Sequence, residues 1–256
     1  MLPLAPMKPR CWTWLSLCVA FGLLTARASD QKALSERANR LEDTDQYSAA
    51  LSLLLEAEKA NPGDPFLLAR ISEVYSELSD QGSDEGTKKK SAQTAVDYAK
   101  QAVSKGPNLG EAHLAMAIAI GKMTDFVDNR TKMEYSRTIK SEAEKAVQLD
   151  PTLDQGYLIL ARWNFEMTQL NPVLKGLAQV MYGQMPAASE SQAIAYFQKA
   201  IAAKPDRIEN YYEYGDALSR MGKKDEAKAQ FEKVLQLPAP GSDDRRMQSE
   251  ARKQLK

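Results

Sequence analysis

The sequence has little of the chemistry on which most active sites depend. It contains one histidine, His113, and two cysteines, Cys11 and Cys18, in 256 residues. Both cysteines lie in the N-terminal segment 1–28, so a chain cleaved after Ala28 carries none. A disulfide framework, a thiolate nucleophile and a metal site built on cysteine and histidine ligands are therefore excluded from such a mature chain.

Phosphate-binding loops and strand-like runs are also missing. Gly82 and Gly86 are not followed by Lys-Ser or Lys-Thr, which a phosphate-binding loop requires. Ala, Leu, Glu, Lys and Gln dominate instead, and these residues favour helices. The sequence therefore predicts an all-α fold that is not an enzyme, with no catalytic residue, no metal ligand and no cofactor. Catalysis would need two carboxylates with strongly perturbed pKa values in one cleft.

The one long apolar run stands at the N-terminus. Lys8 and Arg10 precede it, residues 11–26 carry no charge, and Ala26-Arg27-Ala28 offers small residues at the positions that signal peptidase reads. This order predicts a secretory signal peptide over residues 1–28, followed by one domain over residues 29–256. We therefore expect an exported protein, periplasmic or secreted. An uncleaved anchor is the alternative, although the run is shorter than the ~20 apolar residues of a spanning helix.

Charge is nearly balanced along the rest of the chain. The whole sequence has 34 basic and 34 acidic residues, and the segment 1–28 contains three of the bases and none of the acids. The remaining 31 bases and 34 acids give no broad attraction for nucleic acid or for anionic lipid. We expect no nucleic-acid partner and, after signal cleavage, no membrane span.

A period of 34 residues near the C-terminus indicates a tetratricopeptide-type helical repeat. The period joins two sets of small, aromatic and turn-forming residues: Ala193, Phe197, Ala200 and Pro205, then Ala227, Phe231, Val234 and Ala239 between two prolines. Small residues let two antiparallel helices approach closely, and the rings fill the space between successive pairs. Proline then ends the second helix of the pair.

The same phase continues towards the N-terminus with longer spacing, which indicates insertions at 81–90, 124–130 and 171–189. Within the first insertion, the stretch from Gly82 to Gly86 reads as a solvated loop. The fold predicted is a tetratricopeptide-like α-α superhelix, a solenoid of five helix pairs. The expected pairs and the final capping helix cover residues 31–64, 65–109, 110–153, 154–207, 208–240 and 243–255.

Three stretches of the C-terminal half resemble the regulator of microtubule dynamics family, a set of tetratricopeptide-like proteins with bacterial relatives. They are Ala161–Glu166, residues 176–186 (Gly-Leu-Ala-Gln-Val-Met-Tyr-Gly-Gln-Met-Pro) and Tyr196–Ala200. The resemblance implies helical repeats that bind a partner, and it implies no active site. The microtubule role belongs to eukaryotic members and fits poorly with an exported chain.

Several conspicuous residues have structural interpretations. We expect the imidazole of His113 to be packed and hydrogen-bonded between helices. Asp128 or Asn129 should supply the oxygen that caps the following helix. Trp163, the only tryptophan beyond the signal segment, should pack between repeats.

The first helix of each pair should line the concave side of the superhelix, where a partner binds. Its phase selects a partner-binding groove of polar, charged and aromatic residues: Asn39, Glu73, Lys122, Arg162, Phe165, Glu166, Tyr212, Asp216 and Arg220. The same phase adds Glu77, Glu111 and Glu209. The mixture suits a protein or peptide partner with apolar anchors and polar contacts.

The sequence therefore favours a non-catalytic, exported protein-binding scaffold. One alternative is a carrier or sensor of an apolar small molecule or lipid, because residues 173–182 are apolar enough to line a pocket. Another is a microtubule- or organelle-associated tether, as in eukaryotic relatives. Neither the partner nor the oligomeric state follows from the residues.

Overall fold

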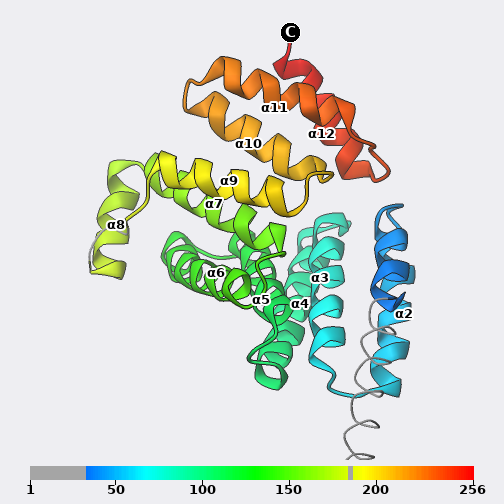
Figure 1. The fold of residues 1–256 in the computed structure, drawn as a ribbon. Coiled ribbons are helices and arrows are strands. Elements are labelled where there is room, and N and C mark those ends of the chain that lie inside the picture. The colour runs from blue at the N-terminus through cyan, green and yellow to red at the C-terminus, as the bar shows by residue number, and fades with distance from the viewer. Residues whose placement is uncertain (1–32, 184–186) are drawn as a thin grey trace, which may run out of the picture.

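The computed structural model describes residues 33–183 and 187–256, and its regular elements are all helices over those ranges (Figure 1). Residues 33–42 are helical. The elements that follow are α2 (Tyr47–Ala60), α3 (Pro65–Gln81), α4 (Glu85–Lys105), α5 (Gly110–Met123), the 3-10 turn η1 (Thr124–Phe126), α6 (Asn129–Leu149), α7 (Asp154–Gln169), α8 (Pro172–Tyr182), α9 (Glu190–Ala203), α10 (Ile208–Arg220), α11 (Lys224–Gln236) and α12 (Ser242–Gln254).

The predicted helix pairs and the capping helix are confirmed. Segment 33–42 pairs with α2, α3 with α4, α5 with α6, α7 with α9, and α10 with α11, while α12 packs on the last pair. The predicted signal peptide, residues 1–28, lies outside the described residues, and so do the last three residues of the 176–186 stretch. No helix among the described residues is long and apolar enough to span a membrane.

Capping side chains fix where the helices begin. Asp64 accepts hydrogen bonds from the backbone N–H groups of Phe66 and Leu67, at 2.9 and 3.3 Å, and Pro65 occupies the first position of α3. Asp128 accepts from the N–H of Thr131 at 2.8 Å, which confirms the capping role predicted for the 125–130 turn.

The loop predicted from Gly82 to Gly86 is confirmed in place but is two residues shorter than predicted. Asp84 caps α4 by accepting from the N–H of Thr87 at 2.9 Å, so α4 begins at Glu85 and only residues 82–84 connect the helices. The insertion lengthens α3 and α4 because a good cap and helix-forming lysines follow the glycine. The 171–189 insertion likewise contains a helix, α8, whose cap is Asn171.

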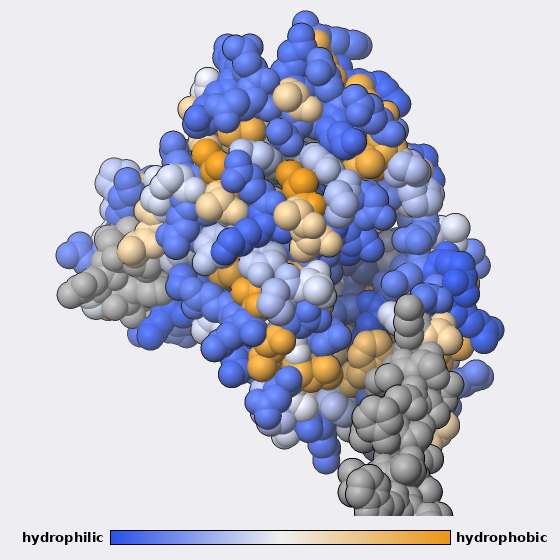
Figure 2. Space-filling model, in the orientation of Figure 1, coloured by the Kyte–Doolittle hydropathy of each residue, from blue (hydrophilic) through white to orange (hydrophobic). Residues whose placement is uncertain are grey.

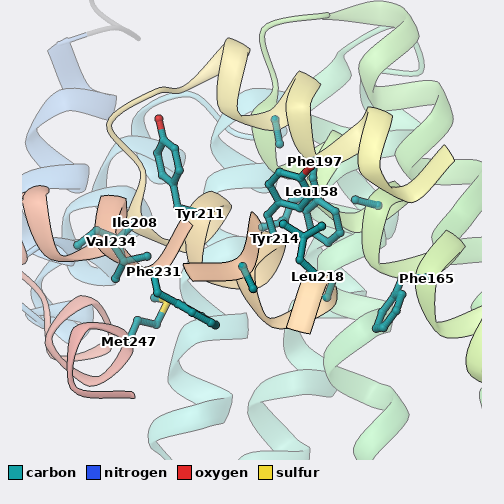
Figure 3. Packing of buried hydrophobic residues seen from close by; sticks show 14 of the residues in the cluster. Leu158, Phe165, Phe197, Ile208, Tyr211, Tyr214, Leu218, Phe231, Val234 and Met247 are labelled. Atoms are coloured by element: carbon teal, nitrogen blue, oxygen red, sulfur yellow. The ribbon is translucent and has the colours of Figure 1, made fainter. Parts of the chain in front are cut away.

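The two rings of the 34-residue period occupy similar core positions. Phe197 is 1 % exposed and stacks on Tyr214, with ring centroids 5.1 Å apart, and Phe231 is 2 % exposed (Figure 3). The ring of Phe231 lies directly on the backbone of α10: a Cβ added at Gly215 would stand 2.9 Å from its Cε1. The small residue of the motif is thus required for close packing, as the period predicts.

The stack curves so that its two ends come together (Figure 1). The turn after the first helical segment lies against the start of α12, where Asp45 is hydrogen-bonded to Ser242. The first helices of the pairs therefore face a common interior, which positions their polar side chains opposite one another.

Candidate functional site: the inner surface

The inner surface is the face of the first helices that is turned away from the second helices. It is formed by charged side chains of segment 33–42, α3, α5, α7 and α10: Glu42, Arg70, Glu73, Glu77, Asp80, Glu111, Lys122, Arg162, Glu166, Glu209, Glu213, Asp216 and Arg220. Most of the groove residues predicted from the sequence belong to it. Hydrophilic residues also dominate the face of the molecule drawn in Figure 2.

At the N-terminal end, Arg70 joins two helices through an acidic pair. Its guanidinium donates to Glu42 at 2.6 Å and to Asn39 at 2.8 Å, and it also forms an ion pair with Glu73. Burial raises the pKa of Glu42, and the charge of Arg70 partly opposes that rise. Asn39 and Glu73, both predicted groove residues, are therefore held in one network around a base that connects two repeats.

In the middle, Lys122 of α5 reaches the carboxylate of Asp80 on α3. Glu77, one turn before Asp80, lies near the same ammonium group, and burial raises the pKa of Glu77 to about 7. The charges of Glu209 on α10 and Asp243 on α12 add to that rise. Since α3 packs on α2, α4 and α5, these acids act on Glu77 across the interior of the superhelix.

At the C-terminal end, two ion pairs join α7 to α10. Arg162 Nε lies 3.6 Å from Glu213, whose pKa is raised by burial. Arg220 donates to Glu166 at 2.6 Å and lies 3.8 Å from Asp216. The predicted groove residues of this half are thus brought together, but the bases among them already have carboxylate partners.

Phe165 is a correction to the predicted site. Its side chain is 2 % exposed and belongs to the core cluster, and the guanidinium of Arg220 covers its ring at 4.5 Å from the centroid. A partner cannot reach this ring without displacing Arg220. Tyr212 is half-buried, with its ring 6.1 Å from that of Phe231, so only part of it faces the interior.

The groove predicted from the motif does not include three residues that lie on the inner surface: Arg70, Asp80 and Glu213. Arg70 precedes Glu73 by three residues, a spacing that places opposite charges side by side on a helix, and this signal was available. Glu213 pairs with a base of another repeat, so its position depends on how α7 and α10 stack.

The interpretations of His113 and Trp163 hold. The Nδ1 of His113 lies 2.6 Å from Glu142 and its Nε2 lies 3.0 Å from the carbonyl oxygen of Pro107, so the ring fastens α5 to α6. Trp163 is 7 % exposed, and its indole N–H donates to Ser136 at 2.9 Å. Both side chains are fully used in packing.

Helix α8 does not close over the interior. It packs on α6, with Ala178 in a small cluster beside Met133 and Trp163, while Val173 and Val180 are each 80 % exposed. The apolar residues that suggested a ligand pocket at 173–182 therefore include two that face solvent.

Within the described part of the chain, no group of three or more His, Cys, Asp or Glu side chains is arranged to hold a metal ion. What the arrangement offers is a concave, mainly acidic surface with fixed ion pairs, which suits binding.

Stacked antiparallel helix pairs, with small and aromatic residues at their contacts and a polar interior, define a tetratricopeptide-repeat protein. In agreement, the structure is similar to that of a thermophilic TPR protein from Thermus thermophilus, with a TM-score of 0.61 at 21 % identity over 88 % of this chain and 98 % of that one. The chain belongs to the regulator of microtubule dynamics protein 1-3 family, whose sequence pattern matches residues 34–256.

Mammalian relatives cover most of the chain at low identity. Regulator of microtubule dynamics protein 1 of Bos taurus is 25 % identical over 233 residues, which is 90 % of this chain and 73 % of the relative. Regulator of microtubule dynamics protein 3 of Mus musculus is 26 % identical over 199 residues, 77 % of this chain and 42 % of the relative. The family and the fold are typical of non-enzymatic scaffolds.

Proposed function

We propose that the protein is a non-catalytic scaffold that binds a protein or peptide partner on its inner surface. The observation that carries the proposal is the convergence of side chains from five repeats on one curved surface, instead of on a closed cavity. An extended or helical segment can contact successive first helices along such a surface. The side chains of Arg162, Asp216 and Arg220 are each about half exposed, so a partner can form polar contacts with them.

We further propose that this scaffold acts outside the cytoplasm, in the periplasm or after secretion. The support is the order of basic, apolar and small residues in segment 1–28. Fractionation of the native host, with detection of the protein by an antibody, tests this: recovery with periplasmic or medium markers is expected, and recovery with cytoplasmic markers contradicts it.

Site-specific photo-crosslinking tests the binding surface directly. A photoreactive amino acid is placed at Arg162 or Asp216 on the inner surface and, as a matched control, at the exposed Lys100 on α4. We expect the same partner to be attached from both inner positions and not from Lys100. Equal attachment from Lys100 would contradict use of the inner surface.

The alternative of a microtubule- or organelle-associated tether is suggested by the names of the mammalian relatives. Co-sedimentation of the purified protein with microtubules distinguishes it from the scaffold proposed here. Binding that survives replacement of Arg162 and Asp216 by Ala would favour the tether.

A further inference from the structure

The carboxylates of the inner surface outnumber its available bases. Among the described residues, Glu77, Glu111 and Glu209 form no ion pair within 4 Å, although each lies on a first helix. Burial raises the pKa of Glu111, a hydrogen bond from its own backbone N–H partly opposes that rise, and the charges of Asp150 and Glu73 add to it. In the middle of the surface, three carboxylates therefore lack an ion-pair partner within 4 Å, although the charge of Lys122 acts on Glu77.

Every base of the inner surface is already compensated. Arg70 contacts Glu42 and Glu73, and Lys122 contacts Asp80. Arg162 and Arg220 contact acids as well, at 3.6 Å from Glu213 and 2.6 Å from Glu166. An acidic partner segment would have to break these ion pairs, whereas a basic segment finds free carboxylates.

Glu77 adds an observation that does not depend on counting charges. Glu77 is half-buried, and the charges that act on its carboxylate are those of Lys122 on α5, Glu209 on α10, Asp243 on α12 and Asp80 on its own helix. Within residues 33–183 and 187–256 it has no hydrogen-bond donor and no ion pair within 4 Å. Because Glu77 is half-buried, its carboxylate is reachable, and it receives no donor from the described chain that a partner's N–H group would have to displace.

A divalent cation is a poor occupant for this position. Calcium requires six to eight oxygen ligands converging on one point. In the part of the chain that the structure describes, no three acidic or histidine side chains converge in this way. The unpaired carboxylates are instead distributed over α3, α5 and α10, a spacing suited to successive cationic side chains of one segment.

We propose that the occupant of the inner surface is a peptide segment rich in Lys and Arg, one of whose cationic side chains reaches Glu77 while others contact Glu111 and Glu209. This inference rests on the proposed scaffold function and names the partner's chemistry. Binding is electrostatic in large part, so it weakens as salt rises. It also releases a proton near neutral pH, because the cation favours the charged form of Glu77.

The test measures fluorescence anisotropy of labelled peptides against the full-length protein and its variants. The probes are a peptide of repeated Lys-Ala-Leu units and two matched peptides with Gln or Glu in place of every Lys. We expect the Lys peptide to bind, with an affinity that falls about tenfold between ~50 mM and ~200 mM salt. Binding of the Glu peptide as tight as that of the Lys peptide would overturn the proposal.

Variants locate the contact. Glu77→Gln and Glu209→Gln are each expected to weaken binding of the Lys peptide about tenfold, which is the size of one lost charge contact. Glu232→Gln, on the exposed side of α11, is the matched control and should leave binding unchanged. Circular dichroism confirms that each variant is folded. Equal effects of all three substitutions, or calcium bound at Glu77 in preference to the peptide, would overturn the proposal.

Failure of this inference is separable from failure of the scaffold. If inner-surface crosslinks capture a partner whose bound segment is acidic or uncharged, the scaffold stands and the cationic segment is wrong. If crosslinks from Arg162 and Asp216 show no preference over Lys100, the scaffold itself is wrong, whatever the Lys peptide does.

Discussion

The carboxylate of Asp45 accepts hydrogen bonds from the backbone N–H of Ser242, at 3.0 Å, and from its hydroxyl group, at 2.8 Å, across 197 positions of the chain. Arg245 adds a contact at 3.3 Å to the same carboxylate. Asp45 itself adopts a left-handed backbone conformation, with a φ of 61°, at the end of the turn that follows segment 33–42. These contacts join the first repeat to the capping helix, so the curvature of the inner surface depends on both ends.

Removing this junction should open the superhelix. Asp45→Ala deletes every acceptor that Ser242 and Arg245 use on that side chain, and the first repeat is then free to move away from α12. The separation is measured by electron paramagnetic resonance between labels on Gln46→Cys and Ser249→Cys, in a chain whose Cys11 and Cys18 are replaced by Ser. We expect a longer and broader distance distribution in the variant. The control Asp125→Ala, an exposed position of η1, should not change it; identical distributions for Asp45→Ala would contradict the junction.

The contact of Gly215 with the ring of Phe231 leaves no room for a side chain at position 215. Gly215→Ala places a Cβ 2.9 Å from the ring, so the helices α10 and α11 must separate or the ring must shift. We expect a loss of about 1–3 kcal/mol in the free energy of unfolding, measured with urea. Gly121→Ala is the control, because a Cβ there has no atom within 4 Å and alanine favours the helix. A stabilising effect of Gly215→Ala would contradict the packing described.

Replacing the imidazole of His113 by an apolar ring should lower the free energy of unfolding. His113→Phe keeps the volume but leaves the carboxylate of Glu142 and the carbonyl of Pro107 without their contact. Because partly buried polar groups that lose a partner are costly, we expect a loss of about 2 kcal/mol in urea unfolding. Unchanged stability would mean that the imidazole contributes only its volume.

The elevated pKa of Glu77 predicts a specific dependence of stability on pH. The folded protein holds a proton on Glu77 up to a pKa of about 7, whereas the unfolded chain releases it near 4.5. Between these values the folded state binds more protons, so the free energy of unfolding falls as pH rises. Glu77→Gln should match the wild type near pH 4 and exceed its stability by about 3 kcal/mol near pH 8.

Urea unfolding from about pH 4 to about pH 8 checks the sign, with Glu232→Gln as the control at an exposed position. A wild type that gains stability relative to Glu77→Gln as pH rises would show that Glu77 is compensated within the folded chain. That result would also remove the uncompensated carboxylate that the proposed cationic segment contacts.

Much of the fold was predictable because small and aromatic side chains recur at fixed spacing in the repeat. The spacing of Ala193, Phe197, Ala227 and Phe231 predicted the last two helix pairs, since small and aromatic residues must recur at each helix contact. The loop predicted from Gly82 to Gly86 lies in the right place but is two residues too long. Asp84 caps α4, so the helix begins at Glu85 and includes Gly86.

The site was less predictable because it depends on relations between repeats. Motif phase places Phe165 on the inner surface, but the ring is covered by Arg220 from another pair. Motif phase likewise does not predict the ion pair between Arg70 and Glu42, or the effect of the charge of Asp243 on the pKa of Glu77. Such contacts follow from the curvature of the stack, which is fixed in part by the junction of Asp45 with Ser242.

The central claim is that a cationic group of a partner reaches the half-buried carboxylate of Glu77, and nuclear magnetic resonance can observe that carboxylate directly. The side-chain carbon of Glu77, assigned by its loss in Glu77→Gln, is titrated in protein labelled with ¹³C at glutamate, with and without the Lys-Ala-Leu peptide. We predict a midpoint near pH 7 in the free protein and a clearly lower midpoint when the peptide is bound. A midpoint that the bound peptide leaves unchanged would contradict the account.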